Sequence, residues 1–449
     1  MYLKRSVLPT IAIQVKSLDL PGVYIGQYYR RFYPDGAMLA PLVGLTNIDE
    51  QGQEGVELAY NDWLVGVSQK KNIRHDRRGD IIDVLVQKTG SQYGKGLALS
   101  IDRRIQHIAH TALIGAIYNY QARSGSIVVL DAKNSEILAI ANHPSFNPNN
   151  RSNLAPELIR NRAVTDVFEP GSVMKPFTIA YALSSGKFQK NDTINTAPGW
   201  LNIDGRKIHD ARNYGELAIA DVLKKSSNVG IAKMMMQLPA LEFKYFLSRF
   251  GFGEVSFSGL PGERSGVISG EGRLTQAKAA SLGFGYGLAA TTLQLAQAYA
   301  VLAAEGVRYP VRIVEGQAQG QRVLDADIAV DVVKMLETVV SPTGTGHRAM
   351  IPGFRVAGKT GTVRMVSKKG YDLDRYTALF AGIVPVNQPR LVVVVVIHDP
   401  RGDRYYGGEI AAPVFATIAK RSLHVLGVEP DNNNDGYKIR EYKKANRSS

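Results

Sequence analysis

Residues 170–175 read Pro170-Gly171-Ser172-Val173-Met174-Lys175, and an apolar run from Phe177 to Leu183 follows them. The run predicts a helix with Ser172 at its start, where the hydroxyl is accessible and the backbone N–H lacks an intrahelical partner. Lys175 lies three residues later, on the same face one turn along. Its amine can accept the Ser172 hydroxyl proton if partial burial and a neighbouring positive charge lower its pKa. The stretch therefore predicts a serine nucleophile with a lysine base.

Two further polar motifs lie downstream. Ser226-Ser227-Asn228 follows a predicted helical segment at residues 217–225, and Lys359-Thr360-Gly361-Thr362 leads into an apolar run. In the functional interpretation, Ser226 relays a proton between Lys175 and a leaving amine, while Asn228 orients Lys175 and holds a substrate amide. Lys359 and Thr360 offer a charge and a hydroxyl to a substrate carboxylate. Gly361 lets a substrate backbone approach the strand edge closely.

Each motif alone is common in protein sequences. Ser-x-x-Lys also occurs at Ser68/Lys71 and Ser184/Lys187, Ser-x-Asn at residues 145–147, and Lys-Thr-Gly at residues 88–90. The alternative interpretation of Ser172 is a plain helix N-cap, and that of Ser226 and Asn228 a cap or a turn. The combination is more specific, because Ser-x-x-Lys, Ser-x-Asn and Lys-Thr-Gly follow one another over the length of one domain. That order, known from penicillin-recognising serine enzymes, selects the motifs that begin at Ser172, Ser226 and Lys359, and it rejects Lys88, which lies before the nucleophile.

The composition is that of a globular protein with a large core. The 449 residues are 45% hydrophobic and 21% charged, and this length predicts about two to three domains. The absence of cysteine excludes a thiol nucleophile and a Cys-ligated metal. A net charge of +14 indicates anionic partners, but no nucleic-acid motif accompanies it. Part of the excess lies in the tail, Lys438 to Arg447, which is typical of a solvated chain end.

Strand patterns occur at both ends of the larger part of the chain. They lie at residues 97–102, 125–130 and 137–141 and again at 378–383 and 391–398, and a mostly helical region, 151–304, separates them. Helices are predicted at residues 103–122 and 411–426. This order predicts a mixed α+β domain with one antiparallel sheet assembled from both ends. We expect a turn-rich module at residues 1–95, with a strand at 81–86, the larger domain at 96–428 and a polar basic tail at 429–449.

Other stretches carry a resemblance to a known family: Thr165 to Ser172, Lys225 to Gly230, Gly262 to Gly266, Phe284 to Gly287, and Tyr405 to Gly408. On these, and on Arg31 to Pro34, Gly52 to Glu57 and Asp102 to Gln106, the chain resembles the division-specific class B penicillin-binding proteins of Gram-negative bacteria. The resemblance runs from about Tyr2 to Pro430. It implies a penicillin-binding serine transpeptidase fold, with a helical subdomain, and a partial, non-catalytic, dimerisation-like pedestal module ahead of it.

The resemblance also implies a reaction. Ser172 would attack the D-Ala-D-Ala carbonyl of a peptidoglycan stem peptide and release D-alanine, with Lys175 as general base. The backbone N–H groups of Ser172 and Thr362 would form the oxyanion hole, and an amine of a neighbouring stem peptide would take the acyl group. The implied partners are stem peptides, β-lactams that trap Ser172, a membrane glycosyltransferase and division proteins. No nucleic acid, metal or cofactor is expected.

Two other functions use the same three motifs. A β-lactamase must deacylate quickly, which in class A requires a Glu-activated water, and no Glu-x-x-x-Asn sequence lies between Asn228 and Lys359. A non-catalytic β-lactam sensor or division scaffold would keep the fold, but the motif residues are all intact, which favours catalysis.

The sequence also bears on location. No stretch approaches the roughly 18 apolar residues of a membrane helix, and no signal peptide begins at Met1. The resembled family carries a single membrane helix ahead of the point that matches Tyr2. We therefore expect the native gene product to be anchored in the inner membrane by an upstream segment, with this chain facing the periplasm.

Overall fold

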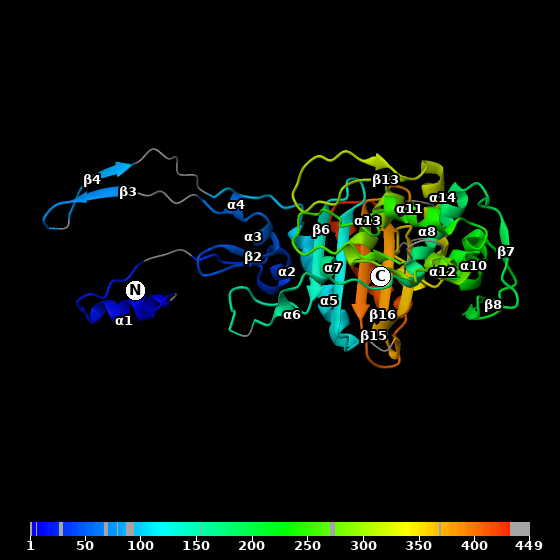
Figure 1. Ribbon diagram of the computed structural model, residues 1–449, viewed down its shortest axis with the longest axis horizontal. Helices are drawn as coiled ribbons and strands as arrows, with labels where there is room; N and C mark the ends of the chain where they lie inside the picture. The colour runs from blue at the N-terminus through cyan, green and yellow to red at the C-terminus, as the bar shows by residue number, and fades with distance from the viewer. Residues whose placement is uncertain are drawn as a thin grey trace, which may run out of the picture.

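A five-stranded antiparallel sheet, in the order β15-β16-β17-β5-β6, forms the centre of the larger domain (Figure 1). The computed structural model describes residues 2–5, 7–26, 30–66, 71–78, 80–86, 94–152, 154–269, 274–367 and 370–431. The strands of the sheet are β5 (Ser124–Asp131), β6 (Ile137–His143), β15 (Ala357–Ser367), β16 (Gly370–Val384) and β17 (Leu391–His398). The sheet is thus assembled from both ends of the domain, as the sequence predicts.

The strand β17 explains why the sheet is covered on both sides. It is a continuous apolar run, and successive side chains of a strand point to opposite faces. Val392, Val394 and Val396 lie in one hydrophobic core, whereas Val393 and Val395 lie in the other. A strand that is buried on both faces requires a layer of helices on each.

Two helices cover one face and two the other. On the first face lie α5 (Arg103–Asn119) and α15 (Gly407–Val425), and on the second lie α13 (Thr292–Ala303) and α14 (Ala326–Val339). The Asp102 carboxylate caps α5 by accepting from the backbone N–H groups of Arg104 and Ile105. Thr291 and Gln294 form a capping box at the start of α13. Local side-chain caps therefore define where α5 and α13 begin.

The chain between β6 and β15 contains more helices and several short strand pairs. The helices are α6 (Pro156–Ile159), α7 (Arg162–Thr165), η2 (Gly171–Met174), α8 (Lys175–Ser184), α9 (Ile219–Lys224), α10 (Asn228–Met235), α11 (Ala240–Arg249), α12 (Gln276–Gly283) and η3 (His347–Ala349). The strands are β7 (Thr193–Asn195), β8 (Trp200–Ile203), β9 (Arg206–His209), β10 (Glu216–Ala218), β11 (Val267–Ile268), β12 (Leu288–Ala289), β13 (Val307–Arg308) and β14 (Gln321–Arg322). The prediction of a mostly helical region at 151–304 is therefore incomplete, because strands of two to four residues are too short to show a hydrophobic period.

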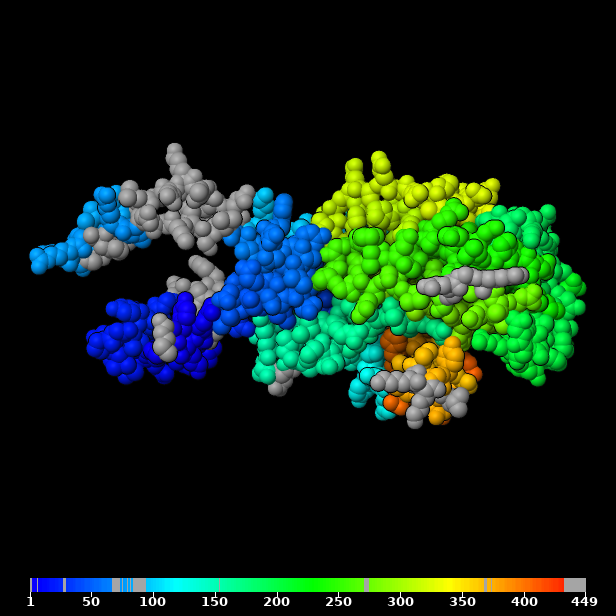
Figure 2. Space-filling model, viewed as in Figure 1, coloured from blue at the N-terminus to red at the C-terminus, as the bar shows by residue number. Residues whose placement is uncertain are grey.

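The N-terminal module extends from one end of the larger domain (Figures 1 and 2). Its elements are α1 (Pro9–Ser17), η1 (Gly36–Met38), α2 (Ala40–Val43), β1 (Leu45–Thr46), β2 (Gly52–Glu54), α3 (Gly55–Ala59), α4 (Asn61–Leu64), β3 (Lys71–His75) and β4 (Ile81–Val86). The strand predicted at residues 81–86 is confirmed as β4. The strand predicted at 97–102 is wrong, since only Leu99 makes an isolated bridge, to Val314.

Hydrogen bonds join the module to the larger domain. The amide of Asn149 accepts from the backbone N–H of Tyr33 at 3.0 Å and donates to its carbonyl at 2.8 Å. Gln106 Nε2, at the start of α5, donates to the carbonyl of Met38 at 3.0 Å. These contacts tie η1 and its surroundings to the domain that carries the three motifs.

No helix within the described ranges is long and apolar enough to cross a membrane. Nor do three His, Cys, Asp or Glu side chains gather anywhere in those ranges in a way that could hold a metal ion. The predicted tail beyond residue 431 lies outside the described residues.

Candidate active site

Ser172 lies in the short 3₁₀ turn η2, directly before α8. Ser172 is partly exposed, whereas its neighbours Gly171 and Val173 are buried. The N-cap positions of η2 and α8 are Pro170 and Met174, and neither makes a side-chain cap. The alternative interpretation of Ser172 as a plain N-cap is therefore wrong.

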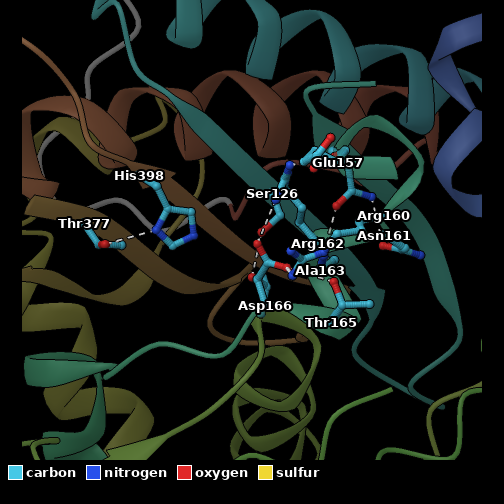
Figure 3. Close-up of polar contacts among 12 residues, drawn as sticks. Ser126, Glu157, Arg160, Asn161, Arg162, Ala163, Thr165, Asp166, Thr377 and His398 are labelled. Atoms are coloured by element: carbon cyan, nitrogen blue, oxygen red, sulfur yellow. Dashed lines mark hydrogen bonds and ion pairs between the residues drawn. The ribbon is translucent and has the colours of Figure 1, made fainter. Parts of the chain in front are cut away.

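The segment before Ser172 contacts the sheet through Phe168. Just before it, the Asp166 carboxylate forms ion pairs with Arg160 and Arg162 (Figure 3). The next aromatic residue, Phe168, packs edge-on against His398 with ring centroids 5.5 Å apart. His398 Nδ1 forms a hydrogen bond of 3.0 Å with Thr377 Oγ1 on β16. Burial lowers the pKa of His398 to about 4, so this contact is made by a neutral imidazole at neutral pH.

Lys175 is fully buried and directed at the second motif. Its Nζ is 2.6 Å from the Ser226 carbonyl oxygen, 3.0 Å from Ser226 Oγ and 2.8 Å from Asn228 Oδ1. Burial lowers the pKa of Lys175 well below its ordinary value, and the charge of Lys359 lowers it further, while Asp210 opposes the shift. Burial is the larger cause, so the environment favours the neutral amine mainly through loss of hydration.

The Ser226 hydroxyl lies between two buried lysines. Lys175 Nζ approaches its Oγ at 3.0 Å and Lys359 Nζ at 2.9 Å. Ser226 has a φ of 56°, in the left-handed region that a serine rarely adopts. Such a conformation persists only where the surroundings enforce it, and it is concentrated at functional sites.

Asp210 holds the second motif in place, although it belongs to none of the three. Its carboxylate accepts from the Ser227 hydroxyl at 2.5 Å and from the backbone N–H groups of Asn228 and Val229 at 2.6 and 3.0 Å. Ser227 in turn caps α10 by accepting from the Gly230 N–H. Nothing in the sequence around Asp210 marks it, since its role depends on the hairpin β8–β9 bringing it to the start of α10.

The third motif lies on β15, an edge strand of the sheet. Lys359 is fully buried, and burial lowers its pKa to about 7. Thr360 Oγ1 donates to Thr345 Oγ1 at 3.2 Å, and Thr362 Oγ1 accepts from a backbone N–H of α15 at 2.9 Å.

Gly361 has a structural reason to be glycine. A Cβ at this position would lie 3.1 Å from Val173 Cγ1 and 3.2 Å from the Pro170 carbonyl oxygen. The close neighbour is thus the protein's own segment at residues 170–173, on the face of the strand. The predicted approach of a substrate backbone to the strand edge stays a prediction.

The competing matches of the three motifs do not reach this site where the structure describes them. Lys187 Nζ donates to the Gln237 carbonyl, beyond the far end of α8, and the Ser145 hydroxyl donates to the Ala37 carbonyl in the N-terminal module. Ser68 and residues 88–90 lie outside the described residues. The chain order selected from sequence is the one that brings Lys175, Ser226 and Lys359 together.

Comparisons with known proteins agree with this arrangement. The family described as "Penicillin binding protein transpeptidase domain" matches residues 125–420. The chain is 43% identical over 433 residues to the "Peptidoglycan D,D-transpeptidase FtsI" of Escherichia coli K12, covering 96% of this chain and 73% of that protein. The chain belongs to the penicillin-binding protein transpeptidases. The family predicted from the sequence is therefore confirmed.

Other members of the penicillin-binding protein family extend the match. The "Probable peptidoglycan D,D-transpeptidase PbpC" of Pseudomonas aeruginosa is 42% identical over 437 residues, 97% of this chain and 77% of that protein. The solved apo structure of the TP domain of Burkholderia pseudomallei penicillin-binding protein 3 is 36% identical, with a TM-score of 0.69, and covers 75% of this chain and 98% of that chain. The predicted mixed α+β penicillin-binding fold is confirmed.

The N-terminal module has its own counterpart in the family. The description "Penicillin-binding Protein dimerisation domain" matches residues 8–99. This agrees with the dimerisation-like pedestal module that the sequence predicts. The boundary at residues 95/96 and the tail at 429–449 stay predictions.

Proposed function

We propose that this chain is a serine D,D-transpeptidase that cross-links peptidoglycan stem peptides through an acyl-enzyme on Ser172. The observation that carries the proposal is the hydroxyl of Ser226, which lies within 3.0 Å of Lys175 Nζ and 2.9 Å of Lys359 Nζ in a buried site. Two buried amines on one hydroxyl form a proton relay only if at least one of them is neutral. Burying two amines costs free energy of folding, because burial disfavours both charges. Groups with such strongly perturbed pKa values are concentrated at functional sites.

The hydrogen bonds of Lys175 support its role as general base. A neutral amine has two N–H donors and one lone pair. The Ser226 carbonyl and Asn228 Oδ1 take the two donors, so the lone pair is left to accept a proton from Ser172 or from the Ser226 hydroxyl. In acylation the Ser172 proton passes to Lys175 as the Oγ–C bond forms. When the C–N bond of D-Ala-D-Ala breaks, the Ser226 hydroxyl gives its proton to the leaving amine and is reprotonated by Lys175.

The remaining motif residues bind and orient the donor peptide. The Ser172 and Thr362 backbone N–H groups stabilise the oxyanion of each tetrahedral intermediate. Lys359, with the hydroxyls of Thr360 and Thr362, attracts the terminal carboxylate of the donor, and Asn228 holds its amide. In the second step the amine of another stem peptide attacks the acyl-enzyme carbonyl and gives a proton to the relay. The C–Oγ bond then breaks, and Lys175 returns a proton to Ser172 Oγ. β-Lactams mimic D-Ala-D-Ala and leave Ser172 acylated.

The family supports the wider assignments. The chain acts in septal wall synthesis at the inner membrane, with its catalytic domain, residues 96–428, in the periplasm. Its partners there are a membrane glycosyltransferase and other division proteins. The relatives named FtsI and PbpC, which match over most of this chain, support these assignments.

Mapping the penicillin adduct by mass spectrometry tests the nucleophile. We expect the adduct on the peptide that contains Ser172. An adduct on Ser184 or Ser226 with Ser172 unmodified would overturn the assignment. Turnover of a D-Ala-D-Ala-type thioester, with an amine acceptor incorporated into the product, separates a transpeptidase from a sensor that only labels. A long-lived acyl-enzyme with penicillin separates it from a β-lactamase.

A further inference from the structure

The Glu169 carboxylate, three residues before Ser172, joins two separate parts of the domain. Its Oε1 accepts from the Gly287 backbone N–H at 2.9 Å. Its Oε2 accepts from the Tyr371 hydroxyl at 2.8 Å, across 202 residues of sequence. Neither partner belongs to the three motifs. A half-buried carboxylate that uses both oxygens in this way fixes the distance between its partners.

The first partner, Gly287, lies in the turn at residues 284–287. This turn packs on one side of the nucleophile segment, residues 170–173. The Gly285 carbonyl of this turn accepts from the Gly171 N–H at 3.1 Å. Gly285 has a φ of 85°, and a Cβ there would lie 2.1 Å from the Gly171 carbonyl oxygen. Gly287 is two residues further along the same turn. The carboxylate of Glu169 therefore holds the turn that touches the residue next to Ser172.

The second partner belongs to the hairpin that supports the same segment on the other side. Tyr371 lies near the start of β16, where it pairs with Val366 of β15. Three residues before Val366 on β15, Val363 packs so closely that a Cβ on Gly171 would lie 2.5 Å from its Cγ2. Gly171 is thus enclosed between the turn and β15, and Glu169 is bonded to the turn and to β16, the strand that pairs with β15.

An aromatic contact also joins the turn to the β15–β16 hairpin. The rings of Tyr286 and Tyr371 meet edge to face with centroids 6.0 Å apart. Burial and the hydrogen bond to Glu169 raise the pKa of Tyr371. Its hydroxyl therefore stays protonated and donates to Glu169 over the pH range in which the enzyme is assayed.

We propose that Glu169 is a positioning residue that sets the spacing between the Ser172 and Thr362 N–H groups by clamping the turn at Gly287 to the hairpin at Tyr371. This rests on the proposed function, which assigns those two N–H groups to the oxyanion hole. One donor is on the nucleophile segment and the other on β15, so their separation depends on how firmly the two are held together. Catalytic groups tolerate displacements of only about 0.5 Å, and an oxyanion donor contributes a large share of the rate.

The test compares Tyr371→Phe, Glu169→Gln and the double variant, with Tyr245→Phe on the exposed side of α11 as a matched control. Rapid-mixing kinetics with a fluorescent penicillin separate the dissociation constant of the initial complex from the acylation rate constant, and deacylation is followed separately. We expect Tyr371→Phe to slow acylation and deacylation by a similar factor, about 10-fold to 100-fold, the effect of one lost hydrogen bond to a charged group. The dissociation constant should stay unchanged, and the double variant should be no slower than the slower single variant.

The two steps distinguish positioning from other roles. Both tetrahedral intermediates use the same oxyanion hole, so a displaced hole slows both steps, whereas direct contact of Glu169 with the ligand would change the dissociation constant instead. Unchanged rate constants in Tyr371→Phe, a change confined to the dissociation constant, or additive effects in the double variant would overturn the inference. Tyr371→Phe decides the question alone if Glu169→Gln does not fold. Failure of the wild-type protein to acylate at Ser172 would overturn the proposed function itself.

Discussion

Lys175 and Lys359 converge on a single atom: their amines lie 3.0 and 2.9 Å from Ser226 Oγ. Both side chains are fully buried, and both have a lowered pKa, to about 7 in the case of Lys359. The two positive charges would repel each other at this distance in a medium of low dielectric constant. The two amines therefore titrate as a coupled pair, so that a change at one alters the pKa of the other.

Replacing Lys175 with arginine should abolish acylation by penicillin. A guanidinium group stays protonated at every accessible pH, so it cannot take the proton of Ser172. We expect a loss of at least about 100-fold in the acylation rate constant, the lower end of what a general base contributes. Lys187→Arg, at the other Ser-x-x-Lys match within the described residues, is the control and should acylate normally. An arginine variant at position 175 with near wild-type acylation would show that another group is the base.

The charge of Lys359 should be visible in the pH profile of acylation. The acid limb of the profile reports protonation of Lys175, which the charge of Lys359 disfavours. In Lys359→Gln that charge is gone, so the pKa of Lys175 rises and the acid limb moves to higher pH. The measurement is the acylation rate constant from about pH 5 to 10, with Lys187→Gln as the control. An acid limb that stayed in place or moved to lower pH would contradict the assignment of Lys175 as the titrating group.

The fold and the motif residues could be predicted because hydrophobic runs and short motifs can be recognised in the sequence itself. The strand β17 is a continuous run of apolar residues, and the motifs of Ser172, Ser226 and Lys359 have distinctive order along the chain. Asp210 and Glu169 could not be found in this way. Each acts through partners that only tertiary structure brings near, such as Tyr371, 202 residues from Glu169. The strand pairs of two to four residues cannot be predicted either, because tertiary contacts define them and they are too short to show an alternation of apolar and polar residues.

Lys359 should reduce the stability of the fold at neutral pH. Its amine titrates at about 7 in the folded chain and near 10.4 in an unfolded one, so the unfolded state binds more protons between these values. Stability therefore rises with pH across this window. Lys359→Met should raise the melting temperature at pH 7 by about 3 °C or more, and the gain should shrink as the pH approaches about 10. Thermal unfolding at several pH values measures this, with Lys187→Met as the exposed control. An increase in melting temperature that grew with pH would contradict the lowered pKa of Lys359 in the folded chain.

Asp210→Asn should shift the pH profile in the direction opposite to Lys359→Gln. The carboxylate raises the pKa of Lys175, so its loss lowers that pKa and moves the acid limb of acylation to lower pH. The variant also weakens the three hydrogen bonds that hold Ser227, Asn228 and Val229, and we expect the maximal acylation rate to fall about 10-fold.

Asp204→Asn is the matched control for this variant, because Asp204 Oδ2 accepts from the Ala277 N–H at the start of α12 at 3.0 Å. That change should cost stability at most, about 1 kcal/mol, and leave the acid limb where it is. Asp210 differs from Asp204 in acting on both the position of Asn228 and the charge on Lys175, and the two effects have separate readouts. A slower Asp210→Asn variant with an unshifted acid limb would limit Asp210 to positioning. A limb moved to higher pH would mean that the carboxylate does not stabilise the protonated amine, and the electrostatic account of the two lysines would fail with it.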